Sequence, residues 1–268
     1  MHISLFNGTN GAIPLSHRAL AYGDGLFETL LADRRGPHWL AAHLDRLYAG
    51  TCRLGMAWSM AQNLALKEQL EALCADLDGP HLIKVMLLRN NPAHGYDFDP
   101  LLQQTDVLLQ CSPYQRPDWT EQGARVGLSG SHVSRNSTLA GMKHLNRLDS
   151  VLARQSARRQ GVDEVLMTTD NGTIIEGSLA NVFFYRQGRW STPAVDQAGV
   201  AGVMREQLLQ RFAQIAVSGT EVDNIDQIES AFLSNSLMGL VPVRCLMGRT
   251  LAIHADIQTF NSELSNQW

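Results

Sequence analysis

Lysine is the scarce basic residue of this chain, and its three positions are the first places to look for covalent chemistry. Of the 22 basic residues only Lys67, Lys84 and Lys143 are lysines, and the rest are arginines. A lysine amine can lose its proton and act as a nucleophile or base, whereas a guanidinium stays charged. Lys67 lies on the charged face of a predicted helix, and Lys84 interrupts a predicted strand, so both are expected to face solvent or a partner.

Lys143 is the strongest of the three candidates. A glycine and a methionine precede it, and a helical pattern begins near His144. This arrangement predicts a rigid junction between a strand and a helix at a domain edge, which is how a Schiff-base lysine is held. The alternative is an exposed lysine at the start of a helix.

Glu176 is a candidate partner for a cationic ligand atom. It ends a predicted strand rich in β-branched residues and comes before a Gly-Ser turn, so we expect it to be half-buried. An isolated buried carboxylate is costly and should have a cationic partner. A protonated pyridine nitrogen would suit, since enzymes that use pyridoxal 5′-phosphate (PLP) commonly supply an acid for it. The alternative is an ordinary glutamate in a hydrogen-bonded turn.

Two loops and one arginine could bind a phosphate group. The loop 198–206 (AGVAGVMRE) runs directly into a helix, whose free N–H groups and positive dipole end attract anions. The turn 234–237 (SNSL) offers hydroxyl and amide donors, and Arg46 could add a bidentate contact. The alternatives are a plain helix start and a solvated arginine. The nine histidines show no metal-ligand spacing, so no metal is expected.

These residues must be positioned by a mixture of helices and strands without strict βαβ alternation, which predicts an α+β fold. In the first half we expect strands at 2–6, 26–32, 82–88 and 105–111, and helices at 40–54 and 59–77, the latter capped by Ser59. In the second half we expect helices at 144–160 and 203–216, and strands at 125–129, 163–169, 173–176, 181–186, 189–192, 217–222, 230–234 and 241–246. In the first of these helices Leu145, Leu148, Leu152 and Ala153 are expected on the apolar side.

Two prolines between residues 111 and 119 interrupt every periodic pattern, and this segment is the expected linker between domains. The division is a small N-terminal α+β domain at 1–113, a linker at 114–119 and a larger C-terminal domain at 120–268.

Composition excludes several classes of protein. The 268 residues are 44% hydrophobic and 18% charged, with a net charge of −4 and no block of like charge, as in an ordinary globular chain. A nucleic-acid or membrane partner would need a basic stripe, and no apolar run approaches the roughly 18 residues of a membrane span. The four cysteines are scattered, the N-terminus is unlike a signal peptide, and glycine-rich nucleotide-binding motifs are absent. We expect a cytoplasmic protein.

Taken together, the motifs resemble those of the fold-type IV PLP enzymes, the family of branched-chain and D-amino-acid aminotransferases and aminodeoxychorismate lyase. The resemblance covers nearly the whole chain, through segments 22–29 (YGDGLFET), 43–46 (HLDR), 141–147 (GMKHLNR), 176–181 (EGSLAN) and 199–205 (GVAGVMR). Within the family, residues 136–147 and 192–204 are most similar to the aminodeoxychorismate lyases, which split 4-amino-4-deoxychorismate into 4-aminobenzoate and pyruvate on the way to folate. The alternatives are an aminotransferase of D- or branched-chain amino acids and, more distantly, a non-catalytic family member.

The resemblance implies a two-domain α+β fold with PLP in the cleft between the domains, and a homodimer. It implies that Lys143 carries PLP as a Schiff base and acts as general acid and base, and that Glu176 pairs with the pyridine nitrogen. The phosphate group is implied to bind Arg46, the backbone amides of Val203 and Met204, and the turn residues Asn235 and Ser236.

The chain departs from the family pattern in one loop. Where relatives carry Arg-Gly-Tyr after the third long strand, this chain has His94-Gly95-Tyr96. The substrate of the lyases has two carboxylates, so cationic donors are expected to face the cofactor from the small domain. Arg89, at a strand end, and His94 are the candidates; the alternative is that both face solvent.

Overall fold

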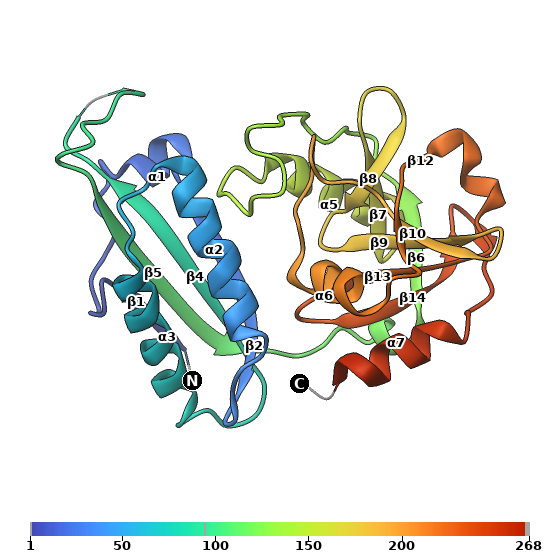
Figure 1. The fold of residues 1–268 in the computed structure, drawn as a ribbon, viewed down its shortest axis with the longest axis horizontal. Helices are drawn as coiled ribbons and strands as arrows, with labels where there is room; N and C mark the ends of the chain where they lie inside the picture. Colours follow the sequence, from blue (N-terminus) through green and yellow to red (C-terminus); the bar gives the residue numbers. More distant parts are fainter. Residues whose placement is uncertain (1, 94, 266–268) are drawn as a thin grey trace. The chain divides into compact units, whose positions relative to one another are not determined.

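The computed structural model describes residues 2–93 and 95–265, and its chain divides into two compact units (Figure 1). Unit 1 comprises Met1–Gln115 and Met142–Asn146, and unit 2 comprises Arg116–Gly141 and Arg147–Trp268. Each unit combines helices with a largely antiparallel sheet, which confirms the predicted α+β class.

Unit 1 is built on a five-stranded antiparallel sheet with the order β1-β5-β4-β2-β3. Its strands are β1 (Ile3–Phe6), β2 (Gly25–Asp33), β3 (Gly36–Pro37), β4 (His81–Asn90) and β5 (Gln104–Pro113). Burial alternates along β2, where Leu26, Glu28 and Leu30 are buried and Phe27 and Thr29 are only partly covered. A strand with one buried face has this period of two, so β2 presents Glu28 and Phe27 to opposite faces of the sheet.

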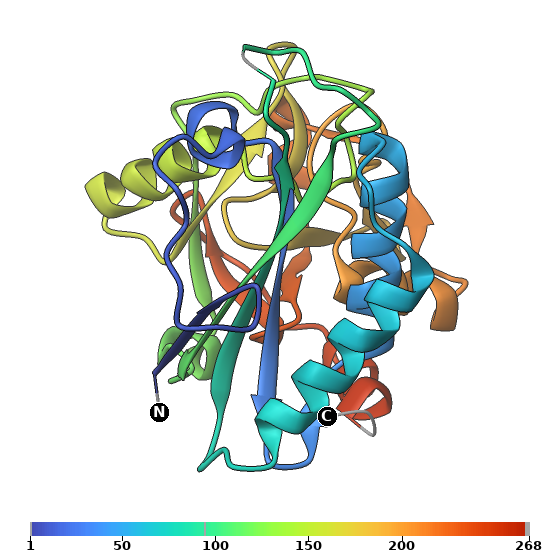
Figure 2. The same ribbon diagram turned by 90° about the vertical axis from the view of Figure 1, so that its left-hand side faces the viewer.

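Helices α2 (Leu40–Leu54) and α3 (Met60–Cys74) pack against this sheet, and the short helix α1 (Arg18–Tyr22) precedes β2 (Figure 2). The apolar stripe of α2 is buried as its spacing predicts, and the helix ends where Gly55 takes a left-handed conformation at φ 59°. Helix α3 starts with a capping box, in which the Ser59 hydroxyl accepts a bond from the Gln62 N–H. The sequence therefore predicted both helices and the Ser59 cap correctly.

The segment Met142–Asn146 extends the sheet of unit 1, although it lies well beyond the expected linker at 114–119. It is joined to β2 by an isolated antiparallel bridge between Leu26 and His144 and is not itself a strand. The prediction of a helix from residue 144 was wrong at its start, because α5 (Leu148–Gln160) begins only after this pairing. The backbone N–H and C=O groups of this segment form hydrogen bonds with β2 and are therefore not available for a first helical turn.

Unit 2 contains a ten-stranded sheet with the order β11-β10-β9-β13-β14-β6-β7-β8-β12, and β15 pairs with β14. The pairs β14–β6, β6–β7 and β10–β11 are parallel and the others are antiparallel. The strands are β6 (Ala124–Leu128), β7 (Glu164–Thr168), β8 (Thr173–Gly177), β9 (Asn181–Arg186), β10 (Arg189–Thr192), β11 (Ala216–Val217), β12 (Thr220–Glu221), β13 (Ser230–Asn235), β14 (Gly239–Leu246) and β15 (Arg249–Thr250).

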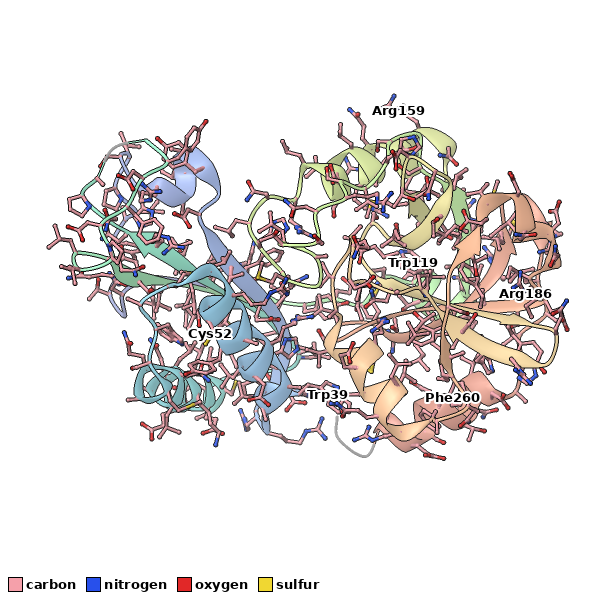
Figure 3. The ribbon with its side chains drawn as sticks, turned by 45° about the horizontal axis from the view of Figure 1, so that its top comes forward. Trp39, Cys52, Trp119, Arg159, Arg186 and Phe260 are labelled. Carbon is pink, nitrogen blue, oxygen red and sulfur yellow. The ribbon has the colours of Figure 1, made fainter. Side chains whose placement is uncertain are left out.

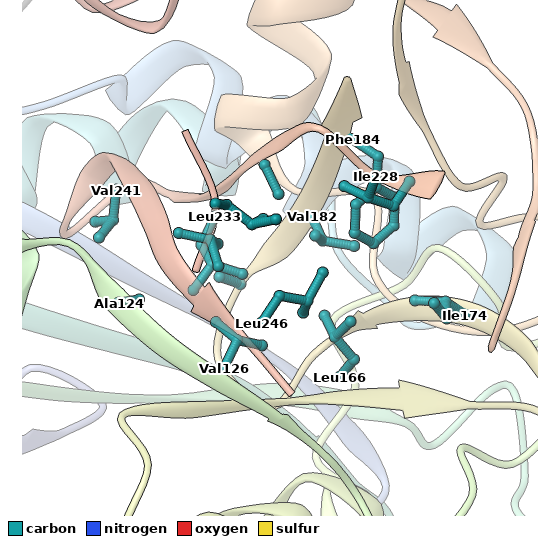
Figure 4. Close-up of a cluster of buried hydrophobic side chains, with 14 of the residues drawn as sticks. Ala124, Val126, Leu166, Ile174, Val182, Phe184, Ile228, Leu233, Val241 and Leu246 are labelled. Atoms are coloured by element: carbon teal, nitrogen blue, oxygen red, sulfur yellow. The ribbon is translucent and has the colours of Figure 1, made fainter. Parts of the chain in front are cut away.

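The main core of unit 2 is a cluster of aliphatic and aromatic side chains from β6, β7, β8, β9, β13 and β14, shown in Figure 4. Val182, Leu233 and Val241 are at most 1% exposed within it. A second cluster places Ala153 and Ala157 of α5 against Val165 and Met167 of β7. Because neighbouring residues of a strand point to opposite faces, β7 contributes to both clusters.

The exposed face of α5 contradicts the predicted orientation of the helix. Leu148 is 75% exposed and Leu152 is 48% exposed, although both were expected on the side that faces the core. The core contact is made by Ala153, as expected, and by Ala157, and both are fully buried. The sequence therefore predicted a helix here correctly, but the leucines Leu148 and Leu152 lie on its exposed side.

The remaining helices of unit 2 are α4 (Trp119–Gln122), α6 (Val203–Arg211), the 3₁₀ helix η1 (Val222–Gln227) and α7 (Asp256–Ser265). Helix α6 ends five residues before the predicted boundary at 216, where β11 begins. Helix α7 was not predicted; its Phe260, labelled in Figure 3, stacks near Phe212, Trp190 and Phe232. No helix in the described part of the chain is long and apolar enough to cross a membrane.

Candidate active site

Lys143 is held in unit 1 by backbone bonds to the start of β2. Its carbonyl accepts a hydrogen bond from the Phe27 N–H at 2.9 Å, and the Leu145 N–H donates to the Gly25 carbonyl at 3.1 Å. The Lys143 amine lies 4.6 Å from the centre of the Phe27 ring. The lysine is therefore fixed at its backbone as a strand residue would be, which is the positioning that covalent chemistry requires.

Lys84 lies close to the same aromatic ring. Its amine is 5.2 Å from the centre of Phe27, so the two lysine amines are no further apart than the sum of both distances, about 10 Å. Lys84 pairs with Thr29 across the sheet and shares the partly covered face with Phe27. The sequence suggested only that Lys84 faces solvent or a partner, and the shared ring could not be read from the spacing of the two lysines.

Arg46 is oriented by a buried carboxylate of β2. Glu28 is 2% exposed and accepts bonds from Arg46 Nε at 2.7 Å and from His43 Nδ1 at 2.7 Å. Burial alone would raise the pKa of Glu28, but the Arg46 charge and the bonds from His43 and Arg46 lower it to about 2. Burial lowers the pKa of His43. Glu28 therefore stays ionised and holds both α2 side chains against the sheet.

Glu176 lies at the end of β8 in unit 2 and is 6% exposed. Its Oε2 accepts a hydrogen bond from the Val200 N–H at 3.0 Å and lies 3.5 Å from the side-chain amide of Asn181. Gly199 has φ 83°, and a Cβ there would lie only 2.7 Å from Ile175. A glycine is thus needed at residue 199 to bring the loop onto Glu176.

Two arginines to which the sequence assigned no role, the partly buried Arg147 and the buried Arg205, act on Glu176. Burial lowers the pKa of both Arg147 and Arg205, and the negative charge of Glu176 opposes that shift in each case. Arg205 is 4% exposed and also bonds to the Pro193 carbonyl. The expectation that Glu176 needs cationic surroundings therefore fits the structure, although the cations here belong to the protein. Both arginines lie in segments that carry the family resemblance, 141–147 and 199–205, but their spacing in the sequence does not reveal that they act on Glu176.

The start of α6 is open to an anion. Gly202 at the N-cap provides no side-chain bond, so the first-turn N–H groups of Val203 and Met204 have no partner within the helix. The Asn181 amide donates to the Val200 carbonyl, and its oxygen lies where a Cβ of Gly202 would be, so the helix start is packed tightly. Both features suit a phosphate cradle.

The turn between β13 and β14 contains the other two expected phosphate ligands. The Asn235 side-chain oxygen accepts bonds from the N–H groups of Leu237 and Met238, and its amide donates to the Leu179 carbonyl. Asn235 thereby shapes the turn that carries Ser236. The neighbouring Ser234 hydroxyl is buried and has no hydrogen-bond partner among the described residues.

Arg89 does not have the surroundings expected of a substrate ligand. It is 4% exposed, and its guanidinium bonds to Asp24, to the Gln103 side chain and to the carbonyls of Leu54 and Gly55 at the end of α2. A cation on the last carbonyls of a helix stabilises that helix end. These contacts indicate a structural role for Arg89. His94, the other candidate, lies outside the described residues.

Among residues 2–93 and 95–265, no group of histidine, cysteine, aspartate or glutamate side chains is arranged to hold a metal ion. In unit 2 the described donors are a carboxylate at Glu176 and backbone N–H groups at the start of α6, and in unit 1 they are the Lys143 amine and the Arg46 guanidinium.

Comparison with known proteins identifies the family. The model of class IV aminotransferases matches residues 25–246. The crystal structure of 4-amino-4-deoxychorismate lyase from Pseudomonas aeruginosa is 32% identical, covers 98% of each chain and has a TM-score of 0.89. An aminodeoxychorismate lyase of Vibrio harveyi is 27% identical over 241 residues, 86% of each chain. A D-alanine aminotransferase of Bacillus licheniformis is 25% identical over 263 residues, 92% of this chain and 89% of that protein.

These matches confirm the resemblance on which the sequence analysis relied. The family match spans the Lys143 segment, Glu176 and the start of α6. The similarity to a solved lyase over almost the whole length confirms the fold of the type IV PLP enzymes. The protein is a member of the class IV aminotransferase family.

Proposed function

We propose that this protein is a PLP-dependent 4-amino-4-deoxychorismate lyase, which forms 4-aminobenzoate and pyruvate. PLP is the cofactor of the family. The proposal rests above all on one observation, the short chain connection between Lys143 and the loop that contacts Glu176. The similarity to two lyases favours this reaction over others in the family.

The connection runs through Gly141. The Gly141 N–H donates to the Gly199 carbonyl at 2.9 Å, and its own carbonyl accepts from the Ala201 N–H at 3.0 Å. Lys143 is only two residues further along, so its Cα lies within about 7 Å of the Gly141 Cα. The backbone next to Lys143 is therefore bonded to the loop that contacts Glu176, and this connection supports the proposed roles of both residues in PLP binding.

The donors fit PLP at both ends of the molecule. An ionised Glu176 suits a protonated pyridine nitrogen, and the open start of α6 suits the phosphate. We propose that the N–H groups of Val203 and Met204 bind this phosphate, together with Arg46 and the turn residues Asn235 and Ser236. Glu28 would orient Arg46 for that contact.

Lys143 would carry out the proton transfers. When bound, PLP supplies an electron sink for bonds that break next to the substrate nitrogen. The Lys143 amine would take the proton from the carbon that bears the amino group and return it to the departing enolpyruvyl group. Loss of that group as pyruvate leaves an aromatic ring, which provides much of the driving force.

The two carboxylates of the substrate need cationic partners. Among the described residues, Lys84 is the candidate partner that the geometry favours. It lies within about 10 Å of the Lys143 amine and shares its aromatic neighbour Phe27. Arg89 already bonds to backbone carbonyls and to the Asp24 carboxylate, so we do not propose it as a substrate ligand. We therefore propose that Lys84 forms a charge-assisted bond with one carboxylate.

A product assay separates the lyase from the aminotransferase reaction. The purified protein with PLP is supplied with 4-amino-4-deoxychorismate and no keto acid, and pyruvate is measured. Release of pyruvate together with 4-aminobenzoate is expected. Turnover that begins only when a keto acid is added would show an aminotransferase. This activity is the second candidate, because the chain is also similar to a D-alanine aminotransferase.

We also propose that the protein is a homodimer. Leu148, Val151 and Leu152 form an exposed apolar stripe on α5, at 75%, 58% and 48% exposure. Apolar residues at this helical spacing are typical of a face that meets a partner. Light scattering is expected to give twice the mass of the chain, and Leu148→Glu should weaken the association. A monomer at micromolar concentration would contradict this proposal.

A further inference from the structure

Glu164, the first residue of β7, is a fully buried acid that the reaction described above does not use. It is 0% exposed. Its Oε1 accepts bonds from the Val165 N–H at 2.8 Å, the Ser178 N–H at 3.1 Å and the Ser178 hydroxyl. Its Oε2 accepts a bond from the Leu179 N–H at 3.1 Å. The Arg154 guanidinium also donates to Oε1, at 3.5 Å, so the carboxylate has five donors, and three of them belong to one turn.

That turn directly follows Glu176. The Gly177 N–H bonds to the Ala180 carbonyl at 2.7 Å, which closes the turn at 177–180. A Cβ on Gly177 would lie 3.3 Å from the Glu164 carboxyl carbon and 3.1 Å from the Ala180 carbonyl oxygen. A side chain at residue 177 would therefore crowd the Glu164 carboxylate, and glycine lets the turn lie directly on it.

The turn links Glu176 to a residue whose side chain contacts the Glu176 carboxylate. Glu176 precedes it, and Asn181 follows it with an amide 3.5 Å from Glu176 Oε2 and bonded to the Val200 carbonyl. Val200 in turn donates its N–H to Glu176. A shift of the turn would therefore move Glu176 and the groups that contact it together.

We propose that Glu164 is a positioning residue for Glu176, and that it fixes the Glu176 carboxylate in the orientation that binds the pyridine nitrogen of PLP. The inference rests on the proposed function. A carboxylate accepts hydrogen bonds and cannot donate one while ionised, so it matches a set of five donors that includes the Arg154 guanidinium. The amide of a glutamine would turn its NH₂ group toward at least one of them.

A double-mutant cycle tests the proposal through PLP affinity. Glu164→Gln, Glu176→Gln and the double variant are prepared as apoproteins, and the PLP dissociation constant and the thermal unfolding temperature are measured for each. Glu164→Gln is expected to raise the dissociation constant about tenfold, as the loss of a charge-assisted bond would. If it acts through Glu176, it should change the constant less than twofold in the Glu176→Gln background.

The unfolding temperature separates positioning from general destabilisation. Glu164→Gln should lower it equally in both backgrounds, because the turn is damaged in both. An equal loss of PLP affinity in both backgrounds would overturn the proposal, and so would an unchanged affinity in the wild-type background. Asp163→Asn is the matched control: Asp163 pairs with exposed Arg125, and its loss should leave PLP affinity unchanged.

A milder variant covers the case in which Glu164→Gln does not fold. Ser178→Ala removes one donor to Glu164 and should raise the PLP dissociation constant about threefold, again only while Glu176 is present. An unchanged constant would count against the proposal. If Glu176→Gln alone leaves PLP affinity and lyase activity unchanged, the proposed role of Glu176 is wrong, and the inference about Glu164 is wrong with it. The single Glu176→Gln variant in the cycle reveals this case.

Discussion

Two buried glutamates, one in each unit, are held by different kinds of groups. Glu28 of unit 1 bonds to His43 and Arg46, both on α2. Glu176 of unit 2 bonds to the N–H of a loop residue, Val200, and lies beside the Asn181 amide. The first arrangement joins a helix to a sheet through charged side chains. The second depends on the shape of a turn and a loop.

This difference predicts that Glu28 acts mainly in stability and Glu176 mainly in function. The Glu28 charge is matched by an arginine that approaches it directly, so removal of Glu28 should affect mainly the folding of unit 1, with a smaller effect on the proposed phosphate contact of Arg46. The Glu176 carboxylate keeps its position only while neighbouring backbone keeps its shape, so its removal should affect mainly ligand binding and chemistry. The following substitutions test this contrast.

The largest expected effect is the loss of stability in Glu28→Gln. Removal of one partner from a buried ion pair costs about 3–5 kcal/mol of unfolding free energy, because the other charge remains buried. Urea denaturation of the variant and the wild type measures the difference. A loss below about 1 kcal/mol would contradict the stabilising role.

The same variant has a defined pH dependence. The pKa of Glu28 falls from its usual 4.5 to about 2 on folding, so its contribution is present above pH 4.5 and is lost as the pH falls towards 2. The difference in unfolding free energy between wild type and Glu28→Gln should therefore shrink between pH 5 and pH 2. A difference that stays constant over this range would show that the charge of Glu28 is not its source.

The next effect is the loss of activity in Glu176→Gln. An amide cannot stabilise a protonated pyridine nitrogen as a carboxylate does, and the loss of one such electrostatic contact lowers kcat about 100-fold. The unfolding free energy should change less than in Glu28→Gln. A variant that unfolds easily but retains its kcat would reverse the contrast between the two glutamates.

A smaller effect is expected on substrate binding in Lys84→Met. Loss of one charge-assisted bond to a substrate carboxylate should raise KM about tenfold and leave kcat within about twofold. Lys67→Met is the matched control, since Lys67 is exposed on α3 and pairs with Glu71. Equal KM values for the two variants would exclude Lys84 from the substrate site.

The smallest effect is expected for Ser59→Ala, which removes the N-cap of α3. Loss of such a cap costs about 1 kcal/mol of unfolding free energy. Because Ser59 contacts neither glutamate, kcat should be unchanged. A fall in kcat would mean that modest destabilisation of unit 1 is enough to impair the reaction, and the activity loss in Glu176→Gln would then be less informative.

The elements best predicted from the sequence were those with a strong local signal. Helix α2 has a regular apolar stripe, and α3 has a capping box, so both were placed closely. The start of α5 was misplaced because pairing of residue 144 with β2 is a contact between distant parts of the chain. The exposed residues Leu148 and Leu152 show a second reason for error. Helical periodicity reveals an apolar face, but it does not show whether the core of the same chain covers that face.

The site shows the same division between local and distant signals. Motifs led to Lys143, Glu176 and the start of α6, where a residue and its immediate neighbours carry the role. Glu164 was missed because a single acid at the start of a strand has no distinctive spacing, and its partners lie at residues 178 and 179. Arg89 was proposed as a substrate ligand from its place at a strand end, and its bonds to backbone carbonyls at the end of α2 could not be read from the sequence.

The most direct test of the whole account is to identify the lysine that binds PLP. The purified protein is incubated with PLP, reduced with borohydride and digested, and the modified peptide is located by mass spectrometry. With only three lysines in the chain, the result is unambiguous. We predict a phosphopyridoxyl group on Lys143 and none in Lys143→Ala. Modification of Lys67 or Lys84 with Lys143 unmodified, or no modification at all, would contradict the account.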